Sequence, residues 1–366
     1  MITFIVATIT FVFIILWFYV FLRSDLKGLL GHSVALVLLV LLNVVALLIS
    51  IGFILASIAP SPFDAQIYTR FAIILFRLGT VLLFIFSETV RRSRFFLVKV
   101  FGVSTILGVN IATYHSVSFK FQKFYGFWER NAVLAFRTIN IVDLALYILL
   151  LLLMVISLLF TTRSALRRIR TESKRSFVAR HYYLTESVII ISCAFFLINR
   201  FFGPGIIINN VVILISIMLI LAILITSVLK YPYLIYAGHA TLLGVMIISQ
   251  ESGVLIYEEG LISGGLFVSG VFWTITKMME ESFGKKPYII SFFDFHLIIN
   301  YVGPIIGVYL FDTYFEELKI FSRYVSETLA KNLRKNGLIG GLFIEDDEVR
   351  HKIVQVIRKT LDPFIP

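Results

Sequence analysis

Cysteine and charged residues are scarce in this chain. Its 366 residues include one cysteine, which excludes an intramolecular disulfide and a zinc site built from cysteine ligands. Only 15% of the residues are charged, whereas 59% are apolar and the mean hydropathy is +0.94. An ordinary soluble domain is less apolar than this. The composition therefore indicates a protein that resides in a membrane.

Seven predominantly apolar stretches lie in the first 229 residues, and each is long enough to predict a membrane span. A spanning helix needs about 20 such residues, because the hydrocarbon core offers no water to free backbone groups. The third stretch is short and contains Arg77. The first begins at the initiator methionine without a basic leader, which predicts a retained helix rather than a cleaved signal peptide. The predicted spans are 2–22, 34–58, 71–87, 95–116, 141–160, 184–202 and 206–229.

The basic residues of the short loops predict the orientation, because such residues are retained on the cytoplasmic side. The first, third and fifth loops carry 12 or 13 Lys and Arg residues, seven of them between Arg163 and Arg180, against 6 in the even loops. We therefore expect a multi-pass protein of the cell membrane, with the N-terminus outside and the C-terminal domain in the cytoplasm.

The net charge of +11 is divided unevenly along the chain. Residues 1–229 hold 20 Lys and Arg against 7 Asp and Glu, a net charge of +13, whereas residues 230–366 hold 13 against 15, a net charge of −2. The basic excess thus belongs to loops that can meet anionic lipid headgroups of the bilayer. An acidic protein partner is the alternative for the run Arg163–Arg180, and nucleic-acid binding is not expected.

Polar groups inside the spans predict a ligand pocket open to the exterior. Each such group costs free energy in hydrocarbon unless it is paired or faces a cavity. Arg77 and Asp143 are expected to pair, because opposite charges offset each other's desolvation. Interhelical hydrogen bonds of the Asn residues and snorkelling of Arg200 are the structural alternative. The candidate ligand-binding residues, all in or beside the outer halves of spans three to seven, are Arg77, Asn110, Asp143, Asn199, Asn209 and Asn210.

Missing motifs exclude several seven-span and signalling classes. A retinal protein carries a Schiff-base lysine in its seventh span, and residues 206–229 contain no lysine. The Asn-Pro-x-x-Tyr pattern of G-protein-coupled receptors is absent, and neither a His-Glu phosphoacceptor box nor a Gly-rich nucleotide box follows the spans. The six histidines have no metal-ligand spacing, and Ser252 lacks a His/Asp arrangement that would make it a nucleophile. We therefore expect no enzyme, no metal site and no cofactor.

The sequence pattern changes after a junction at 230–240. Apolar runs at 241–249 and 254–257, separated by a turn, predict a β-hairpin. This order of elements predicts a five-stranded antiparallel sheet with helices packed on it, an α/β domain over 241–366. An eighth membrane span at 262–283 is the alternative, on length and apolarity. The further expected elements are a helix at 262–283, strands at 288–293, 295–301 and 305–311, and helices at 315–333 and 345–359.

Three short motifs follow one another in this segment: Ser252-Gly253, Ile256-Tyr257 and Leu261-Ile262-Ser263-Gly264. Together they resemble the longin/roadblock-like sensory domains common in archaeal proteins, in which a Ser-Gly turn and an Ile-Tyr strand lead into a Leu-Ile-Ser-Gly helix. A start with a strand favours the longin order over the roadblock order. Residues 1–229 are similar, by span count, spacing and orientation, to the seven-transmembrane sensor region found in front of histidine kinases.

The two resemblances together imply a membrane receptor or sensor that signals by protein recruitment. Longin and roadblock relatives act as platforms for small GTPases or trafficking proteins. The implied partner is therefore a cytoplasmic protein, with small GTPases as the first class to consider. The protein could also form a homodimer. We expect the contact at the edge of the strand 254–257 and on the polar face of the helix 315–333, through Glu316, Lys319 and Arg323. A transporter or a membrane anchor with a regulatory cytoplasmic domain is the alternative.

Overall fold

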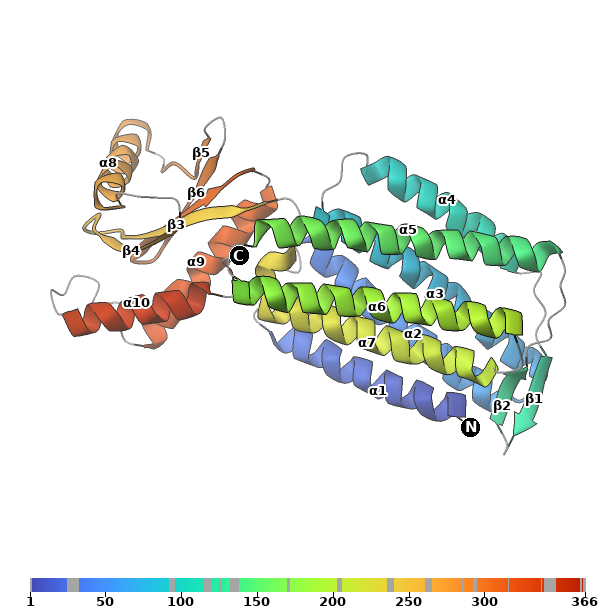
Figure 1. The fold of residues 1–366 in the computed structure, drawn as a ribbon. Coiled ribbons are helices and arrows are strands. Elements are labelled where there is room, and N and C mark those ends of the chain that lie inside the picture. The colour runs from blue at the N-terminus through green and yellow to red at the C-terminus, as the bar shows by residue number, and fades with distance from the viewer. Residues whose placement is uncertain are drawn as a thin grey trace. The chain divides into compact units, whose positions relative to one another are not determined.

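The fold is taken from a computed structural model, shown as a ribbon in Figure 1. The chain forms two compact units that divide at Lys230, and each is described by itself. The structure describes residues 2–24, 33–91, 96–114, 120–124, 127–131, 138–169, 172–202, 206–235, 240–260, 265–284, 286–291, 295–314, 316–336, 338, 347–362 and 364.

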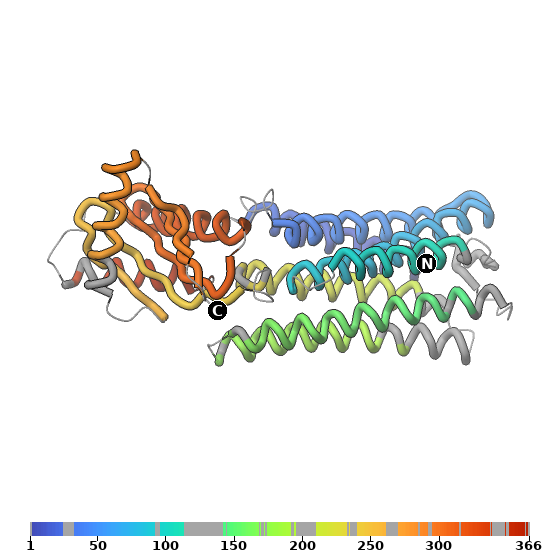
Figure 2. Tube along the Cα trace, turned by 90° about the horizontal axis from the view of Figure 1, so that it is seen from above, coloured from blue at the N-terminus to red at the C-terminus, as the bar shows by residue number. Residues whose placement is uncertain are grey.

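The first unit is a bundle of helices, and each predicted span coincides with one of them. Successive helices run in opposite directions, so odd-numbered and even-numbered connections lie at opposite ends of the bundle (Figure 1). In Figure 2 the blue helices of the N-terminal part lie on one side of the bundle and the green helices on the other. The helices are α1 (Ile2–Arg23), α2 (Val34–Ile58), α3 (Pro62–Arg91), α4 (Phe96–Tyr114), α5 (Thr138–Arg168), α6 (Glu172–Phe202) and α7 (Ile206–Lys230).

Several of these helices are long and apolar enough to cross a membrane. Within the described part of the chain they number five, namely α1, α2, α3, Ala145–Arg167 of α5 and Asn210–Lys230 of α7. The N-terminal region is therefore membrane-embedded, as the composition predicts.

Three helices extend well beyond the predicted spans. Helix α3 begins at Pro62 rather than at residue 71, where the Ser61 hydroxyl caps it by accepting a hydrogen bond from the backbone N–H of Asp64 at 3.1 Å. Helix α5 reaches Arg168 and α6 begins at Glu172, so most of the predicted fifth loop is helical. The bilayer limits the length of an apolar run but not of a helix, and the Arg, Lys and Glu residues found here are good helix formers.

A β-hairpin that the sequence analysis did not predict lies between α4 and α5. Strands β1 (Lys120–Phe124) and β2 (Phe127–Asn131) pair antiparallel, with Lys120 opposite Asn131 and Phe124 opposite Phe127. The hairpin lies at the end of the bundle where α1 begins (Figure 1).

Close packing of small residues joins α2 to α3. A Cβ atom at Gly52 would lie 3.0 Å from the Cβ of Ala72, tighter than an ordinary contact, so glycine favours this close approach of the two backbones. A core around this contact includes Ala7 of α1, Phe53 of α2 and Leu214 of α7, all 1% exposed or less. Four helices therefore share one apolar core.

The second unit is built on a five-stranded antiparallel sheet, as the sequence predicts. A short 3₁₀ helix, η2 (Pro232–Ile235), follows α7, and the strand order is β4-β3-β7-β6-β5. Strand β4 reaches Gly260, three residues beyond the predicted end. The strands are β3 (Leu242–Ser249), β4 (Leu255–Gly260), β5 (Ile289–Ser291), β6 (His296–Val302) and β7 (Ile305–Phe311), and the helices are α8 (Gly265–Phe283), α9 (Glu316–Lys335) and α10 (Asp347–Leu361).

Helices α8 and α9 cover opposite faces of this sheet. Trp273 of α8 packs on a core that includes Met246 and Val308, whereas Tyr309, the next residue of β7, bonds Ser326 of α9 at 2.9 Å. Neighbouring residues of a strand point to opposite faces, so the two helices lie on different sides. Phe272 and Trp273 of α8 pack on the apolar core of the sheet, which favours the core helix over the eighth span. Residues 261–264 of the resemblance lie outside the described residues.

Candidate ligand-binding site

A buried ion pair joins α3 to α5, as their charges predict. The guanidinium of Arg77 donates to both carboxylate oxygens of Asp143, from Nη1 to Oδ1 at 2.7 Å and from Nη2 to Oδ2 at 2.8 Å. Arg77 is 3% exposed and Asp143 is 5% exposed. Two parallel bonds of this kind fix orientation as well as distance. The pair therefore holds the two helices in one rotational setting.

Asn110 of α4 completes this network. Its backbone carbonyl accepts a hydrogen bond from Nη1 of Arg77 at 3.0 Å, and its Nδ2 donates to the backbone carbonyl of Asp143 at 2.9 Å and to Oδ1 at 3.2 Å. Three of the candidate residues are thus brought together on α3, α4 and α5. Each one makes hydrogen bonds with the other two. We call this network of Arg77, Asn110 and Asp143 the fork.

A second polar network joins the same three helices eleven residues further along α3. Glu88 is 2% exposed, and it accepts hydrogen bonds from Lys99 Nζ of α4 at 3.0 Å and from Ser157 Oγ of α5 at 2.7 Å. Sequence reasoning counted Lys99 only as a basic residue near a loop and overlooked Glu88. The available signal was their opposite charge on either side of a short helix connection.

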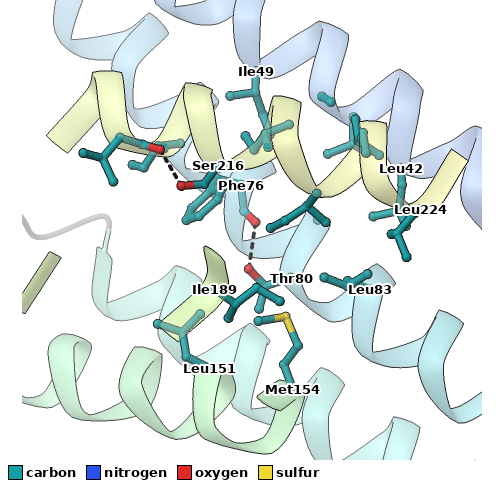
Figure 3. A pocket seen from close by; sticks show the side chains of 18 of the residues that line it. Leu42, Ile49, Phe76, Thr80, Leu83, Leu151, Met154, Ile189, Ser216 and Leu224 are labelled. Atoms are coloured by element: carbon teal, nitrogen blue, oxygen red, sulfur yellow. Dashed lines mark hydrogen bonds between the residues drawn. The ribbon is translucent and has the colours of Figure 1, made fainter. Parts of the chain in front are cut away.

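An apolar cavity of about 100 Å³ lies beside the fork, among α2, α3, α5, α6 and α7. Figure 3 shows its side chains converging from these helices. The hydroxyls of Thr80 and Ser216 bond the backbone carbonyls one turn earlier, of Phe76 at 3.1 Å and of Val212 at 2.6 Å. Tyr147 carries the other hydroxyl of the described lining. The remaining lining residues are apolar and include Leu42, Ile49, Phe76, Leu83, Leu151, Met154, Ile189 and Leu224. The cavity therefore suits an apolar ligand.

One residue, Tyr147 of α5, connects the cavity to the fork. Its ring lines the cavity, and the guanidinium carbon of Arg77 lies 5.4 Å from the ring centroid. The ring also lies 6.3 Å from that of Phe76, a second lining residue. A molecule in the cavity would contact the same ring that contacts the buried cation.

The candidate residues divide into two groups by position. Arg77, Asn110 and Asp143 form the fork and are not among the described lining residues of the cavity. Asn210 is 3% exposed, and its Oδ1 has no hydrogen-bond partner in the described part of the chain. It precedes the lining residue Ile213 by one helical turn on the same face of α7. The side chains of Asn199 and Asn209 lie outside the described residues.

The predicted partner-binding residues lie on α9 of the second unit. Glu316 accepts hydrogen bonds from the Tyr314 hydroxyl at 2.6 Å and from Lys319 Nζ at 3.3 Å, which hold the pKa of its carboxyl below the usual value. Arg323 donates to Glu327 at 2.9 Å. All of these α9 carboxylates and cations are at the surface, opposite the buried face that covers the sheet.

Within the described residues, no group of three or more His, Cys, Asp or Glu side chains could hold a metal ion. No protein-family model matches this chain, and no curated protein matches it significantly.

Proposed function

We propose that this protein is a membrane receptor whose helices bind a small apolar ligand and whose C-terminal domain recruits a protein. In this proposal α1 to α7 all span the bilayer, with the N-terminus outside and the C-terminal domain in the cytoplasm. The observation that carries the proposal is the apolar cavity beside a buried ion pair. Helices of a bundle pack closely as a rule, so an apolar void among them offers space for a ligand.

The ligand is an apolar molecule with one polar end. A cavity of about 100 Å³ holds a small apolar group, such as a ring or the end of a hydrocarbon chain. Asn210 lies one turn of α7, about 5 Å of helix rise, from the lining residue Ile213, and its side-chain oxygen Oδ1 offers an acceptor to a hydroxyl or amide group. Lipid-like molecules combine these two properties.

The signal passes through α7. The two polar networks hold α3, α4 and α5 together, whereas α7 meets the cavity mainly with aliphatic side chains such as Ile217 and Leu221. Aliphatic contacts have no fixed direction, unlike the hydrogen bonds of the fork, so α7 is the lining helix that a ligand can shift most readily against the fork. Helix α7 continues through η2 toward β3, which carries the shift into the C-terminal domain.

The output is a protein contact, with small GTPases as the first partners to test. The strand and helix order of the second unit is the order that the longin resemblance implies, and this supports the assignment by fold analogy. The contact surfaces are the edge of β4 and the charged face of α9. Simultaneous charge reversal, Glu316→Lys with Arg323→Glu, should weaken capture of the partner and leave the fold intact. Lys352→Glu on α10 is the matched control, and equal loss in the control would contradict this surface.

Filling the cavity tests the ligand site. A Cβ atom at Gly79 would lie 3.5 Å from Val45, an ordinary contact, so Gly79→Leu should extend into the cavity without distorting the backbone. The control is Gly108→Leu on α4, where a Cβ atom meets nothing within 4 Å. Mass spectrometry of protein purified from its membranes should find a retained lipid-like molecule in the wild type and the control, but not in Gly79→Leu.

The same variants separate the receptor from the transporter. A receptor with a filled cavity loses its response and still captures its partner, whereas a transporter loses flux. Absence of any retained apolar molecule from the wild type, or substrate flux through the protein in sealed vesicles, would contradict the receptor proposal.

A further inference from the structure

A second, polar recess lies in the C-terminal unit, between α8 and the sheet. Its volume is about 330 Å³, which is within the range of small-molecule sites. Its charged and aromatic lining residues are Glu251 of the β3–β4 turn, Trp273, Lys277 and Glu280 of α8, Lys286 beyond it and Tyr301 of β6. This site is independent of the membrane cavity and of the function proposed above.

Two lysines that line the recess share one carboxylate. Lys286 Nζ lies 3.3 Å from Oε1 of Glu280, and Lys277 Nζ lies 3.6 Å from Oε2. Each carboxylate oxygen thus lies close to its own ammonium group, so the two lysines converge on one position that a carboxylate occupies. The side chains of Lys286, Lys277 and Glu280 are 27%, 46% and 37% exposed, respectively, so an anion from solution can reach them.

Aromatic rings form the wall of the recess and are held in place. The indole of Trp273 donates from Nε1 to the backbone carbonyl of Gln250 at 3.4 Å. Its ring also packs on Gly253 of the β3–β4 turn, where φ is +70° and a Cβ atom would lie 2.6 Å from the ring. The Tyr301 hydroxyl donates to the carbonyl of Pro287 at 3.1 Å. Rings fixed in this way present a preformed surface to a ligand, which reduces the entropy lost on binding.

We propose that this recess binds a small organic anion with a planar ring. Its acidic group lies between Lys277 and Lys286 in place of the Glu280 carboxylate, and its planar part lies against Trp273. Phosphate and carboxylate groups both fit two converging ammonium groups, since each accepts charge-assisted hydrogen bonds. Glu280 then acts as an internal competitor that keeps the lysines close together when the recess is empty.

The fluorescence of Trp273 reports binding in the full-length protein. With Trp17→Phe and Trp128→Phe, Trp273 is the only tryptophan left in the chain. We use AMP as the probe, because it joins a planar base to a phosphate, with adenosine and inorganic phosphate as probes of each part alone. AMP should change the fluorescence in a saturable manner, and each partial probe should bind about tenfold more weakly, as expected for the loss of one charged hydrogen bond or of the stacked ring.

Charge variants test the arrangement of the two lysines. Lys277→Gln and Lys286→Gln should each weaken AMP binding by about tenfold, whereas Glu280→Gln should strengthen it, because the internal carboxylate is removed. The matched control is Lys352→Gln, which breaks a similar Lys–Glu pair on α10 outside the recess. A wild type that gives neither a fluorescence change nor heat on titration with AMP would overturn the proposal. Lysine variants that bind AMP like the control, or weaker binding in Glu280→Gln, would also do so.

Discussion

Separating the two charges of the Arg77–Asp143 fork should destabilise the helical unit far more than removing both together. Asp143→Leu leaves a guanidinium that is 3% exposed without the two bonds that it donates to the carboxylate. Losing one partner of a buried pair costs about 3–5 kcal/mol of unfolding free energy, because the remaining charge is still out of water. Arg77→Met should cost a similar amount, since it leaves the Asp143 carboxylate with the amide of Asn110 but without the cation.

The double variant, Arg77→Met with Asp143→Leu, should lie within about 1 kcal/mol of the wild type, because two apolar side chains of similar volume need no compensation. The assay is reversible unfolding in mixed micelles, with the exposed pair Arg323 and Glu327 as a control that should change by less than about 1 kcal/mol. The reasoning fails if Asp143→Leu costs less than about 1 kcal/mol, or if the losses of the two single variants simply add in the double variant.

Three further predictions concern topology, packing and pH. In a variant without the native cysteine, a new cysteine at the exposed Pro60 should react with an impermeant maleimide on intact cells, whereas one at the exposed Ser176 should not. The opposite labelling would invert the orientation. Gly52→Ala should lower the melting temperature, because its methyl group would lie 3.0 Å from a side chain of α3. Gly79→Ala, whose methyl group would lie 3.5 Å from its nearest neighbour, should not. Equal melting temperatures of the two variants would contradict the close approach of α2 and α3. Burial raises the pKa of Tyr309 above its usual value of 10, so this tyrosine ionises at lower pH in the unfolded chain than in the folded one. The free energy of unfolding should therefore fall as the pH rises above 10. Tyr309→Phe should reduce this fall, and a pH profile that Tyr309→Phe leaves unchanged would refute the assignment to Tyr309.

The elements of the fold were largely predictable, because each depends on a local pattern. Long apolar runs predict a helix at each of seven places. Short apolar runs separated by turn residues predict the five strands of the second unit and their order along the chain. Helix ends were less predictable. The apolar part of α6 begins near Leu184, but the helix begins at Glu172, since charged helix formers extend it beyond the apolar part.

The hairpin β1–β2 was missed although its pattern was visible. Phe119 and Phe121 alternate with Lys120 and Gln122, and Gly126 is a turn signal in the sequence. The segment connects two predicted spans, and its position between them favours a loop over a strand.

The fork and the cavity differ in how far the sequence reveals them, and the reason is energetic. A charge in an apolar run is costly unless it has a partner, so Arg77 predicts that a carboxylate lies near it, and Asp143 is the only acidic residue of the spans whose depth matches. A cavity imposes no such requirement on the residues that line it. Leu42, Ile49 and Leu224 would look the same in sequence whether they filled the space between helices or bordered a void, because the difference lies in the distance between helix axes. Oδ1 of Asn210 lies on the residue one turn before a lining residue of the cavity and has no hydrogen-bond partner in the described part of the chain, so it points to a ligand site only when sequence and structure are combined.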